Sequence, residues 1–138
     1  MGTQDERAVR DFIKEWECSG SWDEAQIERM LKCMTPDARY HVFAWDEPFE
    51  GHAEIRNELR RQAPRFSDVR IEILNVASSN QTVFVERVDW ITKHGNRVGI
   101  HVVGVFELDP AGNVATWRDY SDSREIAIKY GRARDGTS

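Results

Sequence analysis

The sequence of 138 residues has no apolar run that approaches the roughly 20 residues needed to cross a membrane. Its first residues, 1–7, are charged and lack the apolar stretch of a signal peptide. Basic side chains form no stripe and the net charge is −5, which argues against a nucleic-acid partner. We therefore expect a cytoplasmic protein that binds neither membranes nor nucleic acids.

Motifs that would identify a metal, cofactor or nucleophile are also missing. The two cysteines, Cys18 and Cys33, have no framework-like spacing, so we expect free thiols in a reducing compartment. The four histidines are scattered, and no pair has metal-ligand spacing. Neither a Gly-rich phosphate loop nor a dinucleotide fingerprint is present, and no Ser, Cys or His constellation suggests a nucleophile. The sequence therefore predicts no metal site and no cofactor.

The first third of the chain has helical patterning. Two groups of apolar residues recur at helical spacing, namely Val9, Phe12, Ile13 and Trp16, and then Ile27, Met30, Leu31 and Met34. Ser21 and Glu24 have capping-box spacing and are expected to open the second helix, which Pro36 ends. A short third helix is expected over residues 54–63.

The rest of the chain has the alternation typical of β-strands. A strand is expected over 39–45, and four more over 66–77, 82–92, 97–108 and 114–121. The short turns between the last four make them antiparallel neighbours. Helices followed by a meander predict an α+β fold, in which helices pack on one face of a curved antiparallel sheet and leave a cone-like cavity. We expect one domain, residues 1–130, and a flexible tail over 131–138.

Charged residues interrupt the apolar face of one strand. Alternation places on a single face Val83, Val85, Arg87, Asp89 and Ile91. Because charged side chains are rarely buried unless they are paired, Arg87 and Asp89 need a partner there. Asp119 is the candidate, because it can share a face of the last strand with Trp117. A salt bridge on a solvated face would explain the same pattern.

A buried Asp-Arg-Asp triad would be suited to acid/base chemistry. Burial raises the pKa of a carboxyl group, whereas a neighbouring guanidinium lowers it. The two acids can therefore differ in protonation state. One acid then donates a proton to a leaving oxygen, and the other removes a proton from water.

Several segments resemble the limonene-1,2-epoxide hydrolase family. The resemblance is carried by residues 86–89, 104–108 and 117–125, with Tyr40 and residues 49–51 adding to it. It covers most of the chain. It implies the cone-shaped fold of nuclear transport factor 2-like proteins, a fold also called cystatin-like and shared by SnoaL-like proteins.

The resemblance also implies residue roles. Asp89 would donate a proton to the epoxide oxygen, and Asp119 would remove a proton from water. Arg87 would bridge the two acids, and Tyr40 would help to hold the water. No cofactor takes part in this one-step reaction.

One position departs from the family pattern. The family usually has an asparagine two residues after the tyrosine, as a second ligand of the water, and Val42 stands there. Its side chain cannot hydrogen-bond. Two alternatives therefore stay open: a SnoaL-like lyase, isomerase or dehydratase acting on an aromatic, polyketide or terpenoid substrate, and a non-catalytic small-molecule-binding domain.

The expected pocket is apolar and suits a small substrate of terpene or aromatic size. We expect its walls to include Val42, Trp45, Phe49, Ile91, Ile100, Val102 and Trp117. Related domains commonly pair through the convex face of the sheet, so we also expect a homodimer. The sequence does not identify the substrate or its stereochemistry.

Overall fold

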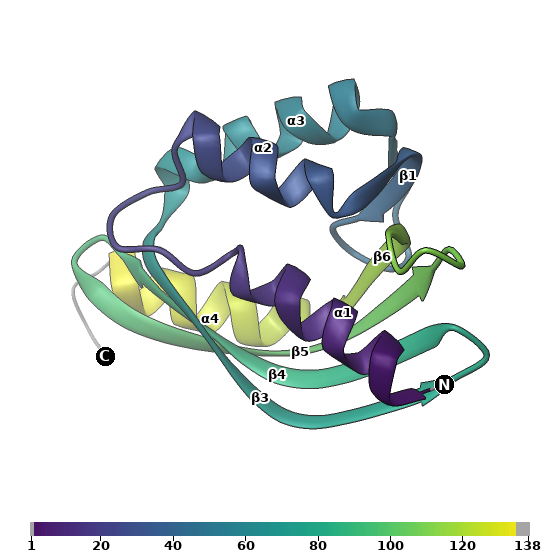
Figure 1. Cartoon of the computed structure of the whole chain (residues 1–138). Coiled ribbons are helices and arrows are strands. Elements are labelled where there is room, and N and C mark those ends of the chain that lie inside the picture. The colour runs from purple at the N-terminus through teal and green to yellow at the C-terminus, as the bar shows by residue number, and fades with distance from the viewer. Residues whose placement is uncertain (1, 135–138) are drawn as a thin grey trace.

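The computed structural model describes residues 2–134. Figure 1 shows a strongly curved sheet with helices packed over one side, which is the expected α+β fold. The helices that precede the long strands are α1 (Gly2–Lys14), α2 (Glu24–Lys32) and α3 (Gly51–Gln62). The 3-10 turn η1 (Ala63–Arg65) then leads from α3 into the meander.

The sheet has six strands in the order β2-β1-β6-β5-β4-β3. Their bounds are β1 (Met34–His41), β2 (Phe49–Glu50), β3 (Ser67–Ser79), β4 (Thr82–Lys93), β5 (Asn96–Leu108) and β6 (Val114–Ser121). The last four strands form the expected antiparallel meander. The pairing of β1 with β6 is parallel, which sequence patterning did not predict.

The second helix and the first strand differ from expectation. The N-cap of α2 is Asp23, whose carboxylate accepts a hydrogen bond from the backbone N–H of Gln26, so Ser21 does not cap it. The helix ends before Met34, which begins β1. Pro36 lies within this strand, where the register with β6 shifts. A missing N–H is tolerated at such an irregularity, which explains why proline did not mark the boundary.

The C-terminal segment is helical for longer than expected. Helix α4 (Ser123–Arg134) follows β6 and packs against β5, where Lys129 Nζ donates to the carbonyl oxygen of Gly99 at 2.6 Å. Residues 131–134, which were expected to belong to a flexible tail, are the last turn of α4, and residues 135–138 lie outside the described part. Within the described residues, no helix is long and apolar enough to cross a membrane.

The core lies between the helices and the concave face of the sheet. It buries the expected apolar faces of α1 and α2 against Val83 and Val85 of β4, and against Phe106 of β5. Ile55 and Leu59 of α3 are buried as well, as their spacing predicts. Arg87 lies on this same concave face, and it is the largest fully buried side chain in the core.

The convex face of the sheet carries large side chains that are exposed. Four of them alternate with concave-facing neighbours on the central strands, namely Phe84, Trp90, Val103 and Tyr120. Exposed apolar groups that gather on one face are typical of a surface that another molecule covers. The expected homodimer stays a prediction.

Candidate active site

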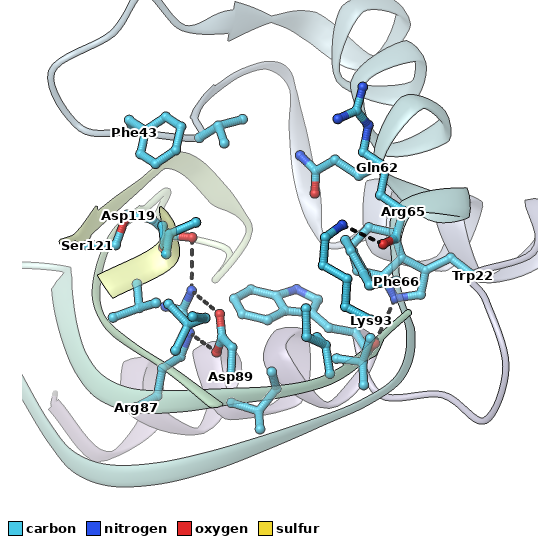
Figure 2. A pocket seen from close by; sticks show the side chains of 18 of the residues that line it. Trp22, Phe43, Gln62, Arg65, Phe66, Arg87, Asp89, Lys93, Asp119 and Ser121 are labelled. Atoms are coloured by element: carbon cyan, nitrogen blue, oxygen red, sulfur yellow. Dashed lines mark hydrogen bonds and ion pairs between the residues drawn. The ribbon is translucent and has the colours of Figure 1, made fainter. Parts of the chain in front are cut away.

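Arg87 bridges two carboxylates on the concave face of the sheet. Its Nε donates to Asp89 Oδ1 at 2.7 Å, and its Nη2 donates to Asp89 Oδ2 at 3.3 Å and to Asp119 Oδ2 at 2.9 Å. Figure 2 shows both acids joined to the one guanidinium. The Arg87 side chain is 1% exposed, and those of Asp89 and Asp119 are 25% and 13% exposed. This burial excludes the salt bridge on a solvated face.

A glycine lets the guanidinium reach across the sheet. Strand β5 lies between β4 and β6, and its Gly104 pairs with Val85 on one side and Asp119 on the other. Because Gly104 has no side chain, Arg87 can lie over β5 and meet the acid on the far strand. A Cβ added at Gly104 would overlap Nη1 of Arg87 and lie 2.7 Å from Cε1 of Phe106. The triad therefore depends on the absence of a side chain at Gly104, which lies between Arg87 and Asp119.

Aromatic rings hold the acid on β6 in place. The ring of Trp117 stacks between Trp16 and Tyr40, with centroids 4.6 Å and 3.9 Å away. Its Nε1 donates to Asp119 Oδ1 at 2.9 Å. The guanidinium carbon of Arg87 lies 4.9 Å from the centroid of the Trp16 ring, a cation–π contact. Both oxygens of Asp119 thus accept hydrogen bonds from groups that are themselves packed.

Burial and the neighbouring charges shift the pKa values of Arg87 and Asp119. Burial opposes the charge of Arg87, but Asp119 and Asp89 outweigh it, so the pKa of Arg87 lies above its usual value. Burial also raises the pKa of Asp119, although the charge and hydrogen bond of Arg87 oppose that rise. Asp119 is therefore a stronger base when ionised than an ordinary aspartate, and it takes up a proton more readily.

Tyr40 lies beside the triad and is tied to helix α3. Burial and the charge of Asp119 raise the pKa of Tyr40, so its hydroxyl stays neutral. Gln62 Nε2 donates to this hydroxyl at 3.3 Å and to Glu58 Oε2 at 2.8 Å. Glu58 is buried and also accepts two hydrogen bonds of 2.7 Å from Arg61. A polar network thus runs from the surface of α3 to the pocket.

The triad opens into a pocket of about 440 Å³. This volume suits a small molecule of terpene or aromatic size. The four members of the predicted site, Arg87, Asp89, Asp119 and Tyr40, all line the pocket. So do five of the predicted wall residues, namely Val42, Ile91, Ile100, Val102 and Trp117. Among the described residues, no group of three His, Cys, Asp or Glu side chains is placed to hold a metal ion.

Two predicted wall residues do not line the pocket. Trp45 is 81% exposed, because β1 ends at His41 and the chain turns, with the backbone N–H of Asp46 donating to the carbonyl oxygen of Phe43. Phe49 belongs to β2 and packs half-buried against the main core. Phe43, which had not been considered, lines the pocket instead.

The pocket also contains residues that the sequence analysis missed. Gln62 is the last residue of α3, and Phe66 follows η1. Ile126 and Tyr130 come from α4. Trp16 was assigned to the core by its helical spacing, and it lines the pocket as well. No local pattern signals these positions, because each reaches the pocket through the packing of a helix or loop against the sheet.

Comparison with known proteins places this fold in a family. Residues 9–117 match the family model described as a SnoaL-like domain. The chain belongs to the SnoaL-like family. Among solved structures, this SnoaL-like chain is similar to an LEH-like epoxide hydrolase of Mycobacterium tuberculosis, with a TM-score of 0.78 and 24% identity over 98% of this chain and 95% of that chain.

Two further structures show the range of proteins with this SnoaL-like fold. The epoxide hydrolase/cyclase-like enzyme SalBIII, which acts in pyran ring formation in the polyether salinomycin, matches with a TM-score of 0.74 and 19% identity, over 89% of this chain and 94% of that one. A protein of Shewanella putrefaciens that has been assigned as a SnoaL-like polyketide cyclase matches with a TM-score of 0.77 and 13% identity, over 93% of this chain and 96% of that one. Identities this low establish the shared fold and leave the reaction to the site residues.

Proposed function

We propose that the protein is a cofactor-independent epoxide hydrolase of the limonene-1,2-epoxide hydrolase type, which opens an apolar epoxide with water in one step. The observation that carries the proposal is the Asp89–Arg87–Asp119 triad, in which a buried guanidinium joins two half-buried acids at the wall of a largely apolar pocket. Two acids and one guanidinium within hydrogen-bond contact supply both a proton donor and a proton acceptor. The two half-buried thiols, Cys18 and Cys33, are free, in keeping with a cytoplasmic setting.

The proposed reaction balances with these groups alone. Asp119 takes a proton from water while the water oxygen forms a bond to one epoxide carbon. The carbon–oxygen bond of the ring breaks, and its electron pair goes to the epoxide oxygen, which receives the proton of Asp89. Arg87 contacts both acids and stabilises the charge that moves between them. Proton return from Asp119 to Asp89 restores the starting state.

Val42 favours a second candidate, a lyase, isomerase or cyclase that needs no positioned water. Its side chain lines the pocket close to Tyr40 and offers water no hydrogen bond. The same acid and base can then move protons within one substrate, with no nucleophile from solvent. A non-catalytic small-molecule-binding domain would use the pocket without needing either acid.

Labelled water distinguishes these functions. Excess enzyme is mixed with limonene-1,2-epoxide in H₂¹⁸O, and the product of a single turnover is analysed by mass spectrometry. We expect a diol with one ¹⁸O atom, because water attacks carbon directly. An unlabelled diol would indicate attack by a carboxylate, and an unlabelled rearranged product or released fragment would support the second candidate. No product from a panel of apolar epoxides, with tight binding of the diols, would support the binding domain.

The raised pKa of Asp119 predicts the acidic side of the pH–rate profile. The base must be ionised, so kcat/KM should fall about tenfold per pH unit once the pH drops below this pKa, which lies above that of an ordinary aspartate. The hydrogen bond from Trp117 lowers the pKa of Asp119, so Trp117→Phe should move the acidic limb to higher pH. A limb that stays in place, or moves to lower pH, would contradict the assignment of Asp119 as base.

A further inference from the structure

The carboxamide of Gln62 is held at the pocket wall by two hydrogen bonds from its nitrogen. Gln62 is the last residue of α3, and its Nε2 donates to Glu58 Oε2 at 2.8 Å and to the Tyr40 hydroxyl at 3.3 Å. These two hydrogen bonds use both N–H groups of the amide. Figure 2 shows Gln62 across the pocket from Asp119, with its amide oxygen pointing into the cavity.

Glu58 determines which way this amide faces. Burial alone would raise the pKa of Glu58, but hydrogen bonds from Arg61 and Gln62 outweigh it and lower the pKa below its usual value. Glu58 is therefore ionised near neutral pH, and an ionised carboxylate only accepts hydrogen bonds. The amide nitrogen of Gln62 must face it, which leaves Oε1 directed to the pocket as an acceptor.

The same network directs the proton of Tyr40. Its hydroxyl oxygen accepts from Gln62, so its own O–H is free to donate elsewhere. Tyr40 also lies close enough to Asp119 for the charge of that acid to raise the pKa of its hydroxyl, and both residues line the same pocket. The pocket thus presents one donor, Tyr40, and two acceptors, Asp119 and Gln62.

We infer that Gln62 Oε1 is a ligand of the nucleophilic water and that Glu58 is a positioning residue behind it, an inference that rests on the proposed hydrolysis. A water molecule has two protons and two lone pairs. It donates one proton to Asp119 and the other to Gln62, and it accepts from Tyr40. One lone pair then remains to attack the epoxide carbon. Helix α3 supplies the amide that the strand position of Val42 lacks.

Replacing Gln62 tests the inference. Gln62→Leu keeps the approximate size of the side chain and removes its hydrogen bonds. We expect kcat for limonene-1,2-epoxide to fall about 10- to 100-fold with little change in KM, because the interaction stabilises attack by water rather than substrate binding. Asn57→Leu is the matched control, an exposed amide on the same helix, and should keep wild-type kcat.

A rescue variant separates positioning of water from a structural role. Val42→Asn in the Gln62→Leu background returns an amide to the pocket next to Tyr40, and we expect it to recover kcat by about tenfold or more. Glu58→Gln provides a second variant. It allows the Gln62 amide to flip, so that its nitrogen instead of its oxygen can face the pocket, and it should also lower kcat with KM retained. Unchanged kcat in both Gln62→Leu and Glu58→Gln would overturn the inference, as would a loss in kcat that Val42→Asn leaves unrepaired.

The inference and the proposed function fail in different ways. A wild-type protein that turns over the epoxide without incorporating ¹⁸O overturns both. A wild-type protein that forms labelled diol, together with a Gln62→Leu variant that is equally fast, overturns the role of Gln62 alone. Labelled diol from wild type and a slow Gln62→Leu variant that Val42→Asn rescues supports both.

Discussion

Replacing either acid of the triad by asparagine is expected to lower kcat for epoxide hydrolysis by about 10²- to 10⁴-fold. A carboxamide at either position can neither donate a carboxylic proton nor accept one, so each variant removes a single proton transfer. The double variant should be little slower than either single variant, because the two transfers belong to one step. Steady-state kinetics on limonene-1,2-epoxide, with the heavy-oxygen product assay, measures these losses.

The folded state should survive both substitutions. Asp119 accepts from Arg87 on one oxygen and from Trp117 on the other, and an amide can replace only one of these acceptors. We therefore expect Asp119→Asn to lower the free energy of unfolding by about 1–3 kcal/mol, measured by denaturant titration. Asp122→Asn is the control, a conservative change just beyond the same strand that should keep both activity and stability. A folded Asp89→Asn or Asp119→Asn variant with wild-type turnover would contradict the acid/base roles proposed for the triad.

The sequence predicted the triad because strand alternation is a strong local rule. Alternation placed Arg87 and Asp89 on the face that carries Val83 and Val85, which favoured burial, although a salt bridge on a solvated face fitted the same pattern. The antiparallel meander could also be predicted, because its turns are short, and the observed β6 has the expected bounds. What alternation could not provide was the distance between β4 and β6, which depends on β5 lying between them.

Positions set by packing between distant elements could not be predicted. Gln62 reaches the pocket only because α3 packs against β1, and Trp16 only because α1 crosses the concave face (Figure 1). The prediction that Trp45 lines the pocket was wrong for a different reason. Its apolar character suggested that the strand continues to it, but the chain turns after His41 and leaves Trp45 exposed to solvent. Side-chain type alone does not distinguish a wall residue from an exposed loop residue.

Gly104→Ala is expected to disable the triad without altering any of its three residues. A methyl group at this position overlaps Nη1 of Arg87 and the ring of Phe106, and both are buried with little room to move. Overpacking of this kind costs about 1–3 kcal/mol of stability. Displacing the guanidinium by about 1 Å from Asp119 should lower kcat about 10²-fold. It should also raise the pKa of Asp119 further, because the charge of Arg87 is the largest effect holding it down.

A glycine on the opposite face of the same strand gives the matched control. In Gly99→Ala the new methyl group meets the ring of Trp90, which is partly exposed on the convex face, on the other side of the sheet from the triad, and whose Nε1 donates to Glu72 Oε1 at 3.0 Å. This variant should lose some stability and keep wild-type kcat and pH dependence. If Gly104→Ala instead keeps the wild-type pH–rate profile, the guanidinium does not control the protonation of Asp119. Comparing the acidic limbs of the two alanine variants therefore separates overpacking from loss of the bridge between the acids, because only the latter moves the pKa of the base.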